Sequence, residues 1–324
     1  MRALALGSFD GVHCGHQALL AATVAAASGP SGVDAAASRA AAGVAAAQEK
    51  LTPTALVIHD AELACPAGGA PHPPRLLSPA RHEAELRAAG MRDIIHLTLD
   101  ADMRALDPAR FVDWLAAQEA RVLLAGENFR FGRGRAGTAA VLAERKAAAG
   151  LAVQIVPLLV RDGVAVSSTR IRELLAAGEV AGAAELLGRP HELTGTVVHG
   201  AGRGRALGFP TVNLDCPSMV APAYGVYLAA VAGAPGAAWA LVSYGVRPTF
   251  AADRRGALLE AHLLDWQGDL YGRELTLQVV ARLREERQYE TISELIGQLH
   301  ADAAQARELI TTYAVTRALR RVTG

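Results

Sequence analysis

The chain has 324 residues, of which 51% are hydrophobic, so it is long enough for two domains that each bury a core. Lys and Arg together number 32, as do Asp and Glu, and this balance argues against a nucleic-acid or membrane-surface partner. The cysteines Cys14, Cys65 and Cys216 form no Cys-x-x-Cys pair and no signal-peptide pattern opens the chain, which predicts a reduced, cytoplasmic protein.

The first predicted unit is a strand, a tight turn and a helix within residues 3–20. The apolar run 3–6 breaks at Gly7, and a helical pattern resumes from Gln17. A turn between a strand and a helix aims backbone N–H groups at a phosphate. The candidate phosphate-binding residues of this turn are Gly7, Phe9, Asp10, Gly11 and Gly15.

Two histidines three residues apart, His13 and His16, lie in the same turn. Side chains at this spacing share one helix face, so both imidazoles can donate to one oxyanion. A zinc pair is one alternative, but no further ligands follow at a recognisable spacing. A pair of partly buried structural histidines is the other. The strand before and the helix after favour the phosphate site, and His-x-Gly-His in this setting resembles the nucleotidyltransferase superfamily.

The rest of the first half alternates strands and helices. The order predicts a Rossmann-like α/β domain with a parallel sheet and helical crossovers. Ligands bind at the carboxyl ends of such strands, where the candidate polar residues fall. The alanine-rich stretch 21–50 has no assigned chemistry. The predicted strands cover 54–58, 93–99, 122–125 and 152–157, and the predicted helices cover 78–90, 108–119 and 138–149.

Two further stretches in this half carry polar groups. Asn128 follows a predicted strand between two phenylalanines, which suits a planar ring held by stacking, although an ordinary turn with core phenylalanines is the alternative. The hydroxyls of 167–169 precede a predicted helix over 172–187 and could be simple N-caps. Together with the arginines beside them, they fit a second phosphate clamp, for which the candidates are Ser168, Thr169 and Arg170.

The second half changes to short β-rich runs separated by turns, which predicts a small antiparallel barrel or sandwich. A long helical pattern over 291–318 follows them. The helix 172–187 and the Gly-Arg-Pro after it form the linker, so the predicted domains are 1–187 and 188–324. The predicted strands of this half are 193–199, 225–231, 238–244, 258–264 and 275–284.

Residues 199–214 join a glycine-rich loop to a strand. The loop lacks the Gly-Lys-Ser/Thr of a P-loop, but its N–H groups could cradle phosphates; a hairpin loop without a ligand is the alternative. Thr211 and Asn213 alternate on the strand, so they face one side and could share Mg²⁺ and its phosphates. Glu260 is a lone carboxylate in an apolar strand, where burial would imply a purpose and solvent exposure would not. The phosphate-binding candidates in the loop are Gly202, Arg205 and Gly208.

Over essentially its whole length the sequence resembles the prokaryotic bifunctional riboflavin kinases and FMN adenylyltransferases, also called FAD synthetases. The likeness is carried by GSFDGVHCGHQALL, GENFRFG, SSTRIR, GFPTVNL, GVRPTF, LLEAHLLDWQGDLYGREL and LREERQY. GFPT-x-N, RPTF and DLYG together are very specific to the kinase half. The resemblance implies a nucleotidyltransferase domain of α/β class, followed by a β-barrel kinase domain with a terminal helix.

In the kinase half, the resemblance implies that Thr211 and Asn213 hold Mg²⁺ and the ATP phosphates. Glu260 would be the general base on the riboflavin 5′-hydroxyl, and Arg284 would help to position the flavin. The chemistry would then be mostly positioning and charge neutralisation around an in-line transfer.

In the first half, the resemblance implies that His13 and His16 stabilise charge on the ATP triphosphate while the FMN phosphate attacks the α-phosphorus. Asn128 would lie by the nucleotide. The pyrophosphate that leaves would be steadied by Ser168, Thr169 and Arg170.

Two stretches depart from the family pattern. The family carries Phe-x-Pro-His-Pro directly after the second strand, whereas this strand ends Val57-Ile58-His59-Asp60-Ala61, and Pro71-His72-Pro73 lies in a later loop. Ser243-Tyr244 stands where Asn-Ile or Asn-Val is usual.

From the resemblance as a whole, we expect an enzyme that converts riboflavin to FMN and FMN to FAD with ATP and Mg²⁺. The alternatives are a kinase whose first domain is weakened or altered in specificity, and a non-catalytic flavin-binding or sensing protein. A weak homo-oligomer is compatible with all three of these hypotheses.

Overall fold

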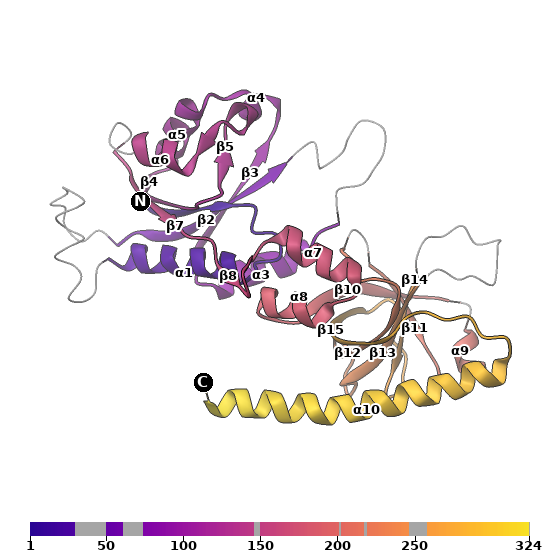
Figure 1. Cartoon of the computed structure of the whole chain (residues 1–324). Helices are drawn as coiled ribbons and strands as arrows, with labels where there is room; N and C mark the ends of the chain where they lie inside the picture. The colour runs from indigo at the N-terminus through magenta and orange to yellow at the C-terminus, as the bar shows by residue number, and fades with distance from the viewer. Residues whose placement is uncertain are drawn as a thin grey trace. The chain divides into compact units, whose positions relative to one another are not determined.

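The computed structural model describes residues 1–29, 50–60, 74–145, 150–200, 202–216, 219–245 and 258–323. Three stretches named above lie outside these residues: most of the alanine-rich stretch, the Pro-His-Pro of 71–73 and the Arg-Pro-Thr-Phe of 247–250. The chain divides into two compact units, Met1–Arg170 and Ile171–Gly324 (Figure 1). The domain boundary after residue 187 stays a prediction.

The first unit contains the predicted parallel sheet, with the strand order β3-β2-β1-β4-β7. The chain runs from the central β1 outward to β2 and β3, and then returns to the other side of β1. A topological switch point therefore lies between β1 and β4, which is where open α/β sheets bind ligands. The strands are β1 (Arg2–Gly7), β2 (Thr52–Asp60), β3 (Asp93–Leu99), β4 (Ala120–Gly126) and β7 (Ala152–Val156).

Helices cover both faces of this sheet (Figure 1). Successive side chains of a strand point to opposite faces, so Ala3 and Ala5 pack in the core under α1 and α3, whereas Leu4 and Leu6 pack under α5 and α6. Burial on both faces is the usual reason for the continuous apolar runs of parallel strands. The helices are α1 (Cys14–Ser28), α3 (Pro79–Ala88), α5 (Pro108–Ala117) and α6 (Ala139–Arg145).

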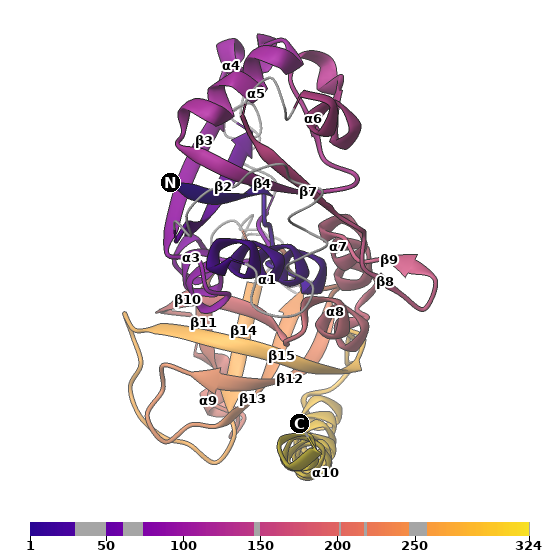
Figure 2. The same cartoon turned by 90° about the vertical axis from the view of Figure 1, so that its left-hand side faces the viewer.

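Several local predictions were wrong in detail. α1 begins at Cys14 rather than Gln17, because the His13 side chain caps it. The predicted helix 172–187 is two helices, α7 (Ser168–Ala177) and α8 (Val180–Leu187), separated at Gly178, whose φ of 79° is left-handed. Three small features were not predicted. They are helix α4 (Ala101–Ala105), the strands β5 (Arg130–Phe131) and β6 (Gly137–Thr138) with the short helix η1 (Arg133–Arg135), and the strands β8 (Val160–Arg161) and β9 (Val164–Ala165). Figure 2 labels β8 and β9.

The second unit contains a closed antiparallel barrel, which decides between the two predicted architectures. Its strand order is β10-β11-β14-β13-β12-β15, and β15 pairs with β10 to complete the ring. The strands are β10 (His191–Val198), β11 (Val212–Asp215), β12 (Gly225–Ala232), β13 (Trp239–Gly245), β14 (Leu258–Leu263) and β15 (Glu274–Arg284).

A long helix, α10 (Ile292–Thr323), packs on the outside of this barrel (Figure 1). Ala303 and Ala306 of α10 join a buried cluster with Phe209, Val226 and Leu241. The cluster shows which faces of β12 and β13 point outward toward the helix.

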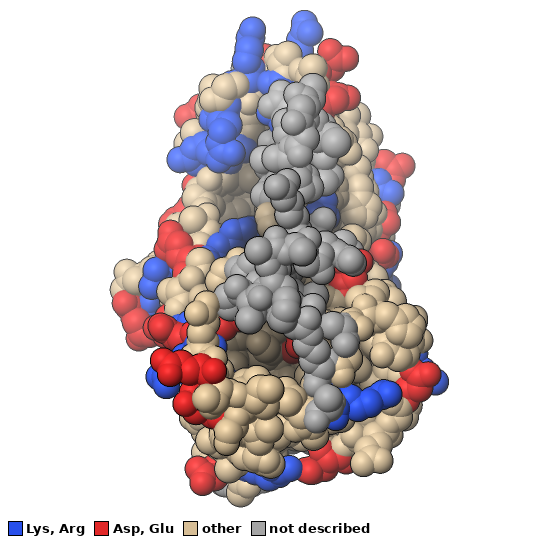
Figure 3. All heavy atoms as spheres, turned by 90° about the vertical axis from the view of Figure 1, so that its right-hand side faces the viewer, with Lys and Arg blue, Asp and Glu red and all other residues tan. Residues whose placement is uncertain are grey.

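Acidic and basic side chains are mixed on the face shown in Figure 3, as the equal counts of both signs lead one to expect. Of the helices in the described ranges, none combines the length and the hydrophobicity that crossing a membrane requires.

Candidate active sites

The turn after β1 has a strained backbone that several hydrogen bonds hold in place. Phe9 and Val12 have φ values of 51° and 39°, which are uncommon for residues with a Cβ. The Phe9 carbonyl accepts from the Val12 N–H at 2.9 Å and from Nε2 of His82 at 3.1 Å. The Phe9 ring packs so closely on Gly7 that a Cβ there would lie 3.2 Å from it. Strain of this kind concentrates at functional sites.

Asp10 connects this turn to two other segments. Its Oδ1 accepts from the Leu76 N–H at 3.1 Å, and its carbonyl accepts from the Ser168 hydroxyl at 2.8 Å. Ser167 Oγ accepts from the Arg170 N–H at 3.2 Å, as an N-cap does. The two predicted phosphate-binding segments therefore lie side by side, and the hydrogen bond from the Ser168 hydroxyl to the Asp10 carbonyl joins them.

His13 and His16 share one face, as predicted. Their rings stack with centroids 3.6 Å apart and an interplanar angle of 17°. Nδ1 of His13 accepts from the His16 N–H at 3.3 Å, so the neutral His13 ring carries its proton on Nε2. Nδ1 of His16 is buried and has no hydrogen-bond partner among the described residues. A Cβ on Gly15 would lie 3.2 Å from the His13 ring, which explains a glycine there.

Burial lowers the pKa of His16 well below its ordinary value, and the neighbouring His13 and His82 lower it further. His16 is therefore neutral at pH 7, and it offers a ligand an N–H rather than a full charge. Both imidazoles stand at the N-terminus of α1, where the helix dipole also favours an anion. This part of the first unit is suited to bind a phosphate chain.

Asn128 lies beyond the end of β4, which pairs with β1, so it belongs to the same sheet edge as the histidines. Its side chain is exposed, and its Oδ1 would lie 3.3 Å from a Cβ on Gly126. Phe129 and Phe131 stack at 5.7 Å and pack into the core. Phe129 and Phe131 are thus core residues, as the alternative interpretation predicted, while the Asn128 amide remains at the edge of the sheet.

A second pair of histidines lies on the neighbouring strands β2 and β3 of the same sheet. Nε2 of His59, on β2, lies 2.8 Å from Nδ1 of His96, on β3, so one ring donates to the other. Burial, followed by the charge of Arg75 and then by His96 and His82, lowers the pKa of His59 to about 4. The spacing of 37 residues between the two histidines gave no signal in the sequence.

We expect the first unit to lose stability as the pH falls from 6.5 to about 4. Over this range the unfolded chain binds a proton at His59 that the folded chain does not, so the free energy of unfolding decreases with decreasing pH. Calorimetry of wild type and His59→Asn across this range tests it. The variant should show a shallower dependence of Tm on pH, with a remainder from His16 and His82; parallel profiles would contradict the assignment.

In the second unit, Asn213 on β11 pairs directly with Glu260 on β14. Side chains of paired antiparallel residues lie on the same face, about 5 Å apart at Cβ. Thr211 precedes Asn213 by two residues and shares that face. Asn213 is buried, and its Oδ1 has no hydrogen-bond partner in the part of the chain that the structure describes. The structure thus pairs two of the three polar residues predicted for this half, and the third, Thr211, lies directly before the start of β11.

The glycine-rich loop lies directly against these residues. A Cβ on Gly200 would overlap the side-chain amide of Asn213. A Cβ on Gly204 would overlap the carbonyl oxygen of Phe209, and it would lie 3.1 Å from Oγ1 of Thr211. Glycine at these two positions therefore allows the loop to approach the strand closely. One correction applies: residues 203–206 form a single helical turn, α9 (Arg203–Ala206), within what was predicted as plain loop, with Gly202 at its N-cap and Arg205 inside it.

The Thr211 hydroxyl and Asn213 amide oxygen fit a magnesium ion, which prefers oxygen ligands and often takes few from the protein. The buried, unpartnered Oδ1 of Asn213 supports the fit. Within the described ranges, no three His, Cys, Asp or Glu side chains cluster closely enough to hold a metal ion. Magnesium sites that take few protein ligands are usually completed by phosphate oxygens of the substrate and by water.

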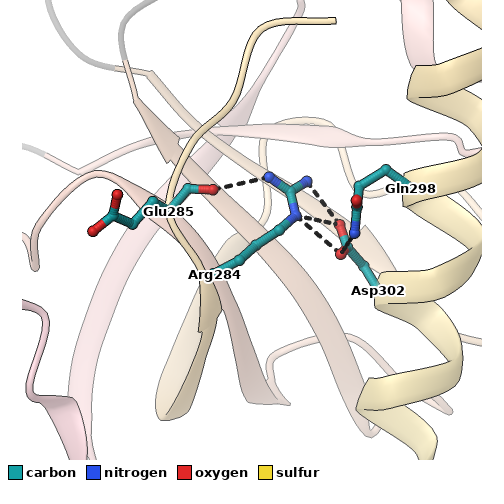
Figure 4. Close-up of polar contacts among 4 residues, drawn as sticks. All are labelled: Arg284, Glu285, Gln298 and Asp302. Carbon is teal, nitrogen blue, oxygen red and sulfur yellow. Dashed lines mark hydrogen bonds and ion pairs between the residues drawn. The ribbon is translucent and has the colours of Figure 1, made fainter.

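Arg284, at the end of β15, is bound by a residue that the sequence analysis missed. Its Nε and Nη2 donate to the carboxylate of Asp302, on α10, at 3.0 and 2.8 Å (Figure 4). In the sequence, Asp302 is one of many polar positions on a long helix, so only the fold identifies it.

Comparisons with known proteins identify the family to which each half of the chain is similar. A family model described as FAD synthetase matches residues 1–36 and 40–170, and one described as riboflavin kinase matches residues 187–310. The bifunctional riboflavin kinase/FMN adenylyltransferase of Pseudomonas fluorescens is 35% identical over 310 residues, which cover 94% of this chain and 91% of the relative. The enzyme of the same description from Escherichia coli (strain K12) is 34% identical over 315 residues, with the same coverage. A crystal structure described as a macrolide-efflux protein from Streptococcus pneumoniae is similar over 94% of each chain, with a TM-score of 0.77 and 28% identity.

Proposed function

The chain belongs to the bifunctional riboflavin kinase/FMN adenylyltransferase family, and on this premise we propose which of its residues carry each reaction. Glu260, with Thr211 and Asn213, serves the kinase reaction. His13 and His16 serve the adenylyl transfer. The observation that carries the proposal is the direct pairing of Asn213 with Glu260 beneath the glycine-rich loop.

In the kinase reaction, the 5′-hydroxyl oxygen of riboflavin attacks the γ-phosphorus of ATP. The new O–P bond forms as the bond from that phosphorus to the bridging oxygen breaks, and ADP leaves. Glu260 accepts the hydroxyl proton. The described part of the loop 199–208, which includes Gly202, Arg205 and Gly208, covers the phosphates with backbone N–H groups.

A magnesium ion bound with ATP would neutralise charge on the phosphates, and Thr211 and Asn213 are the residues that would hold it. The support is the buried amide oxygen of Asn213, which the described residues leave without a partner. Arg284 contributes at the other end of the substrate, near the flavin ring.

In the adenylyl transfer, a phosphate oxygen of FMN attacks the α-phosphorus of ATP and pyrophosphate leaves. The nucleophile is already ionised, so no general base is needed. His13 and His16 donate N–H bonds to the charge that builds on the phosphate chain. Asn128 lies by the nucleotide. The pyrophosphate contacts are Thr169, Arg170 and the backbone around Ser168.

We place the boundary between the two catalytic domains after residue 187, next to the start of the riboflavin kinase match. Both reactions consume ATP, which suits the predicted cytoplasmic location. A weak homo-oligomer remains a prediction.

The experiment that tests the function is incubation of the chain with riboflavin, ATP and Mg²⁺, followed by chromatography of the flavins. FMN and then FAD should appear, and omission of Mg²⁺ with a chelator should abolish FMN. FMN alone would mean that the first unit is inactive or prefers another nucleotide. No phosphorylated flavin would contradict the assignment of both sites.

Gly200→Ala should lower the rate of FMN formation by about a hundredfold, because a Cβ would force the loop away from Asn213. FAD formation from supplied FMN should not change. The matched control is Gly297→Ala on α10, where a Cβ meets nothing within 4 Å. Steady-state rates of both variants are compared, and equal kinase rates would show that the loop does not need this close approach.

A further inference from the structure

One row of paired residues connects Asn213 to Arg284 around the barrel. Asn213 pairs with Glu260, Glu260 with Ser243, Ser243 with Val226, and Val226 with Arg284. Directly paired residues of antiparallel strands point to the same face. Glu260, Ser243 and Val226 therefore point to one face of the barrel. The register between β12 and β15 shifts beside Val226, so the side on which Arg284 lies is fixed instead by its contact with Asp302 of α10.

This shared face is the outer one, beneath α10. Val226 packs with Phe209 and with Ala303 of α10 in the cluster on the outside of the barrel. The path from Glu260 to Arg284 along the row runs around half of the six-stranded ring. The proposed function places Arg284 beside the flavin, and its contact with Asp302 places it on the outer face that α10 covers.

At that end of the row, α10 holds the guanidinium of Arg284 in one orientation (Figure 4). Asp302, which is 1% exposed, accepts from Nε and Nη2, and Nη1 donates to the Glu285 carbonyl at 3.0 Å. Gln298, one turn earlier on α10, donates to Oδ1 of Asp302 at 2.8 Å. The carboxylate is itself held in place by this amide bond, so it cannot rotate freely.

We propose that Asp302 and Gln298 are positioning residues for the kinase reaction, acting through Arg284; the inference rests on the function proposed above. Among the described contacts, three of the five N–H groups of Arg284 are engaged, and two remain for acceptors on the flavin ring. Because the guanidinium is already fixed, the flavin does not have to order a flexible side chain when it binds.

A second ion pair between the same helix and the barrel provides a matched control. Arg307 of α10 donates to Oδ1 of Asp265, which follows β14, at 2.8 Å. Both side chains are more than half exposed, and neither touches Arg284. If the Asp302 pair only tethered α10, its loss would lower stability without raising the KM for riboflavin selectively, and the exposed Asp265 pair shows what loss of a surface tether does.

The test compares Asp302→Asn with Asp265→Asn in the full chain. Asp302→Asn should raise the KM for riboflavin about tenfold, the effect of losing roughly one hydrogen bond to a charged group, with the KM for ATP within about twofold. Asp265→Asn should change neither. FAD formation from supplied FMN, measured on the same preparations, reports whether the first unit is intact. If Asp302→Asn folds poorly, Gln298→Ala is the milder variant, with a smaller rise in the same KM.

A double variant decides whether Asp302 acts through Arg284. Arg284→Lys combined with Asp302→Asn should be no worse in riboflavin KM than Arg284→Lys alone. Additive effects in the double variant would overturn the inference. So would an Asp302→Asn variant in which the KM for riboflavin is unchanged, or one in which the KM values for riboflavin and for ATP rise equally. These outcomes are distinct from failure of the proposed function, in which wild type itself would make no FMN.

Discussion

Glu260→Gln lowers the rate of FMN formation by about 10²–10⁴-fold, the usual contribution of a general base, and leaves FAD formation from supplied FMN unchanged. Glutamine keeps the shape of the side chain but cannot accept the proton of the riboflavin hydroxyl. The row Asn213–Glu260 and the loop above it should stay folded, because the strand pairing runs through backbone groups that the substitution does not change.

The measurement is initial rates of both reactions by separation of flavins. The matched control is Glu274→Gln, an exposed glutamate on β15, which should leave both rates unchanged. Loss of both activities in Glu260→Gln, with an unchanged melting profile, would mean that the assignment of the two reactions to two units is wrong.

His16→Ala has the converse effect: FAD formation falls by about 10²–10³-fold, as when one donor to a developing charge is removed, and FMN formation stays at the wild-type rate. Alanine is a good helix residue, so the first turn of α1 remains. The ring of His13 then loses the ring that stacks on it, and one N–H proposed to face the phosphate chain is missing.

The kinase reaction of the same molecule serves as the internal control for His16→Ala. Raising the concentration of ATP should recover little of the lost rate, because the interaction strengthens as charge develops rather than in the bound ground state. An effect confined to the KM for ATP would instead assign His16 to ground-state binding.

Most of the fold could be predicted because it depends on local patterns. Every predicted strand of the first unit lies within an observed one to within a residue, since apolar runs between turn residues carry the signal themselves. The predicted start of α1 was too late in the sequence because the side chain of His13 caps the helix, and histidine is not among the usual capping residues. The break at Gly178 was missed although a glycine there is a common helix end.

The candidate sites were predictable where their residues are close in sequence and not where the fold joins distant segments. His13 and His16 lie within one turn, so their spacing alone placed them on one face. The pairing of Asn213 with Glu260 joins residues 47 positions apart and follows from strand register, which no local pattern contains. Asp302 and the His59–His96 pair were invisible for the same reason.

Closure of the barrel by β10 and β15 has a consequence for synthesis on the ribosome. The first strand of the ring cannot find its last partner until residues 274–284 have emerged, and the face that holds Arg284 is covered only when α10 follows. The first unit, formed by a continuous earlier segment, can fold while translation proceeds. A nascent chain stalled near residue 270 should therefore already be able to adenylylate FMN, but not yet to phosphorylate riboflavin.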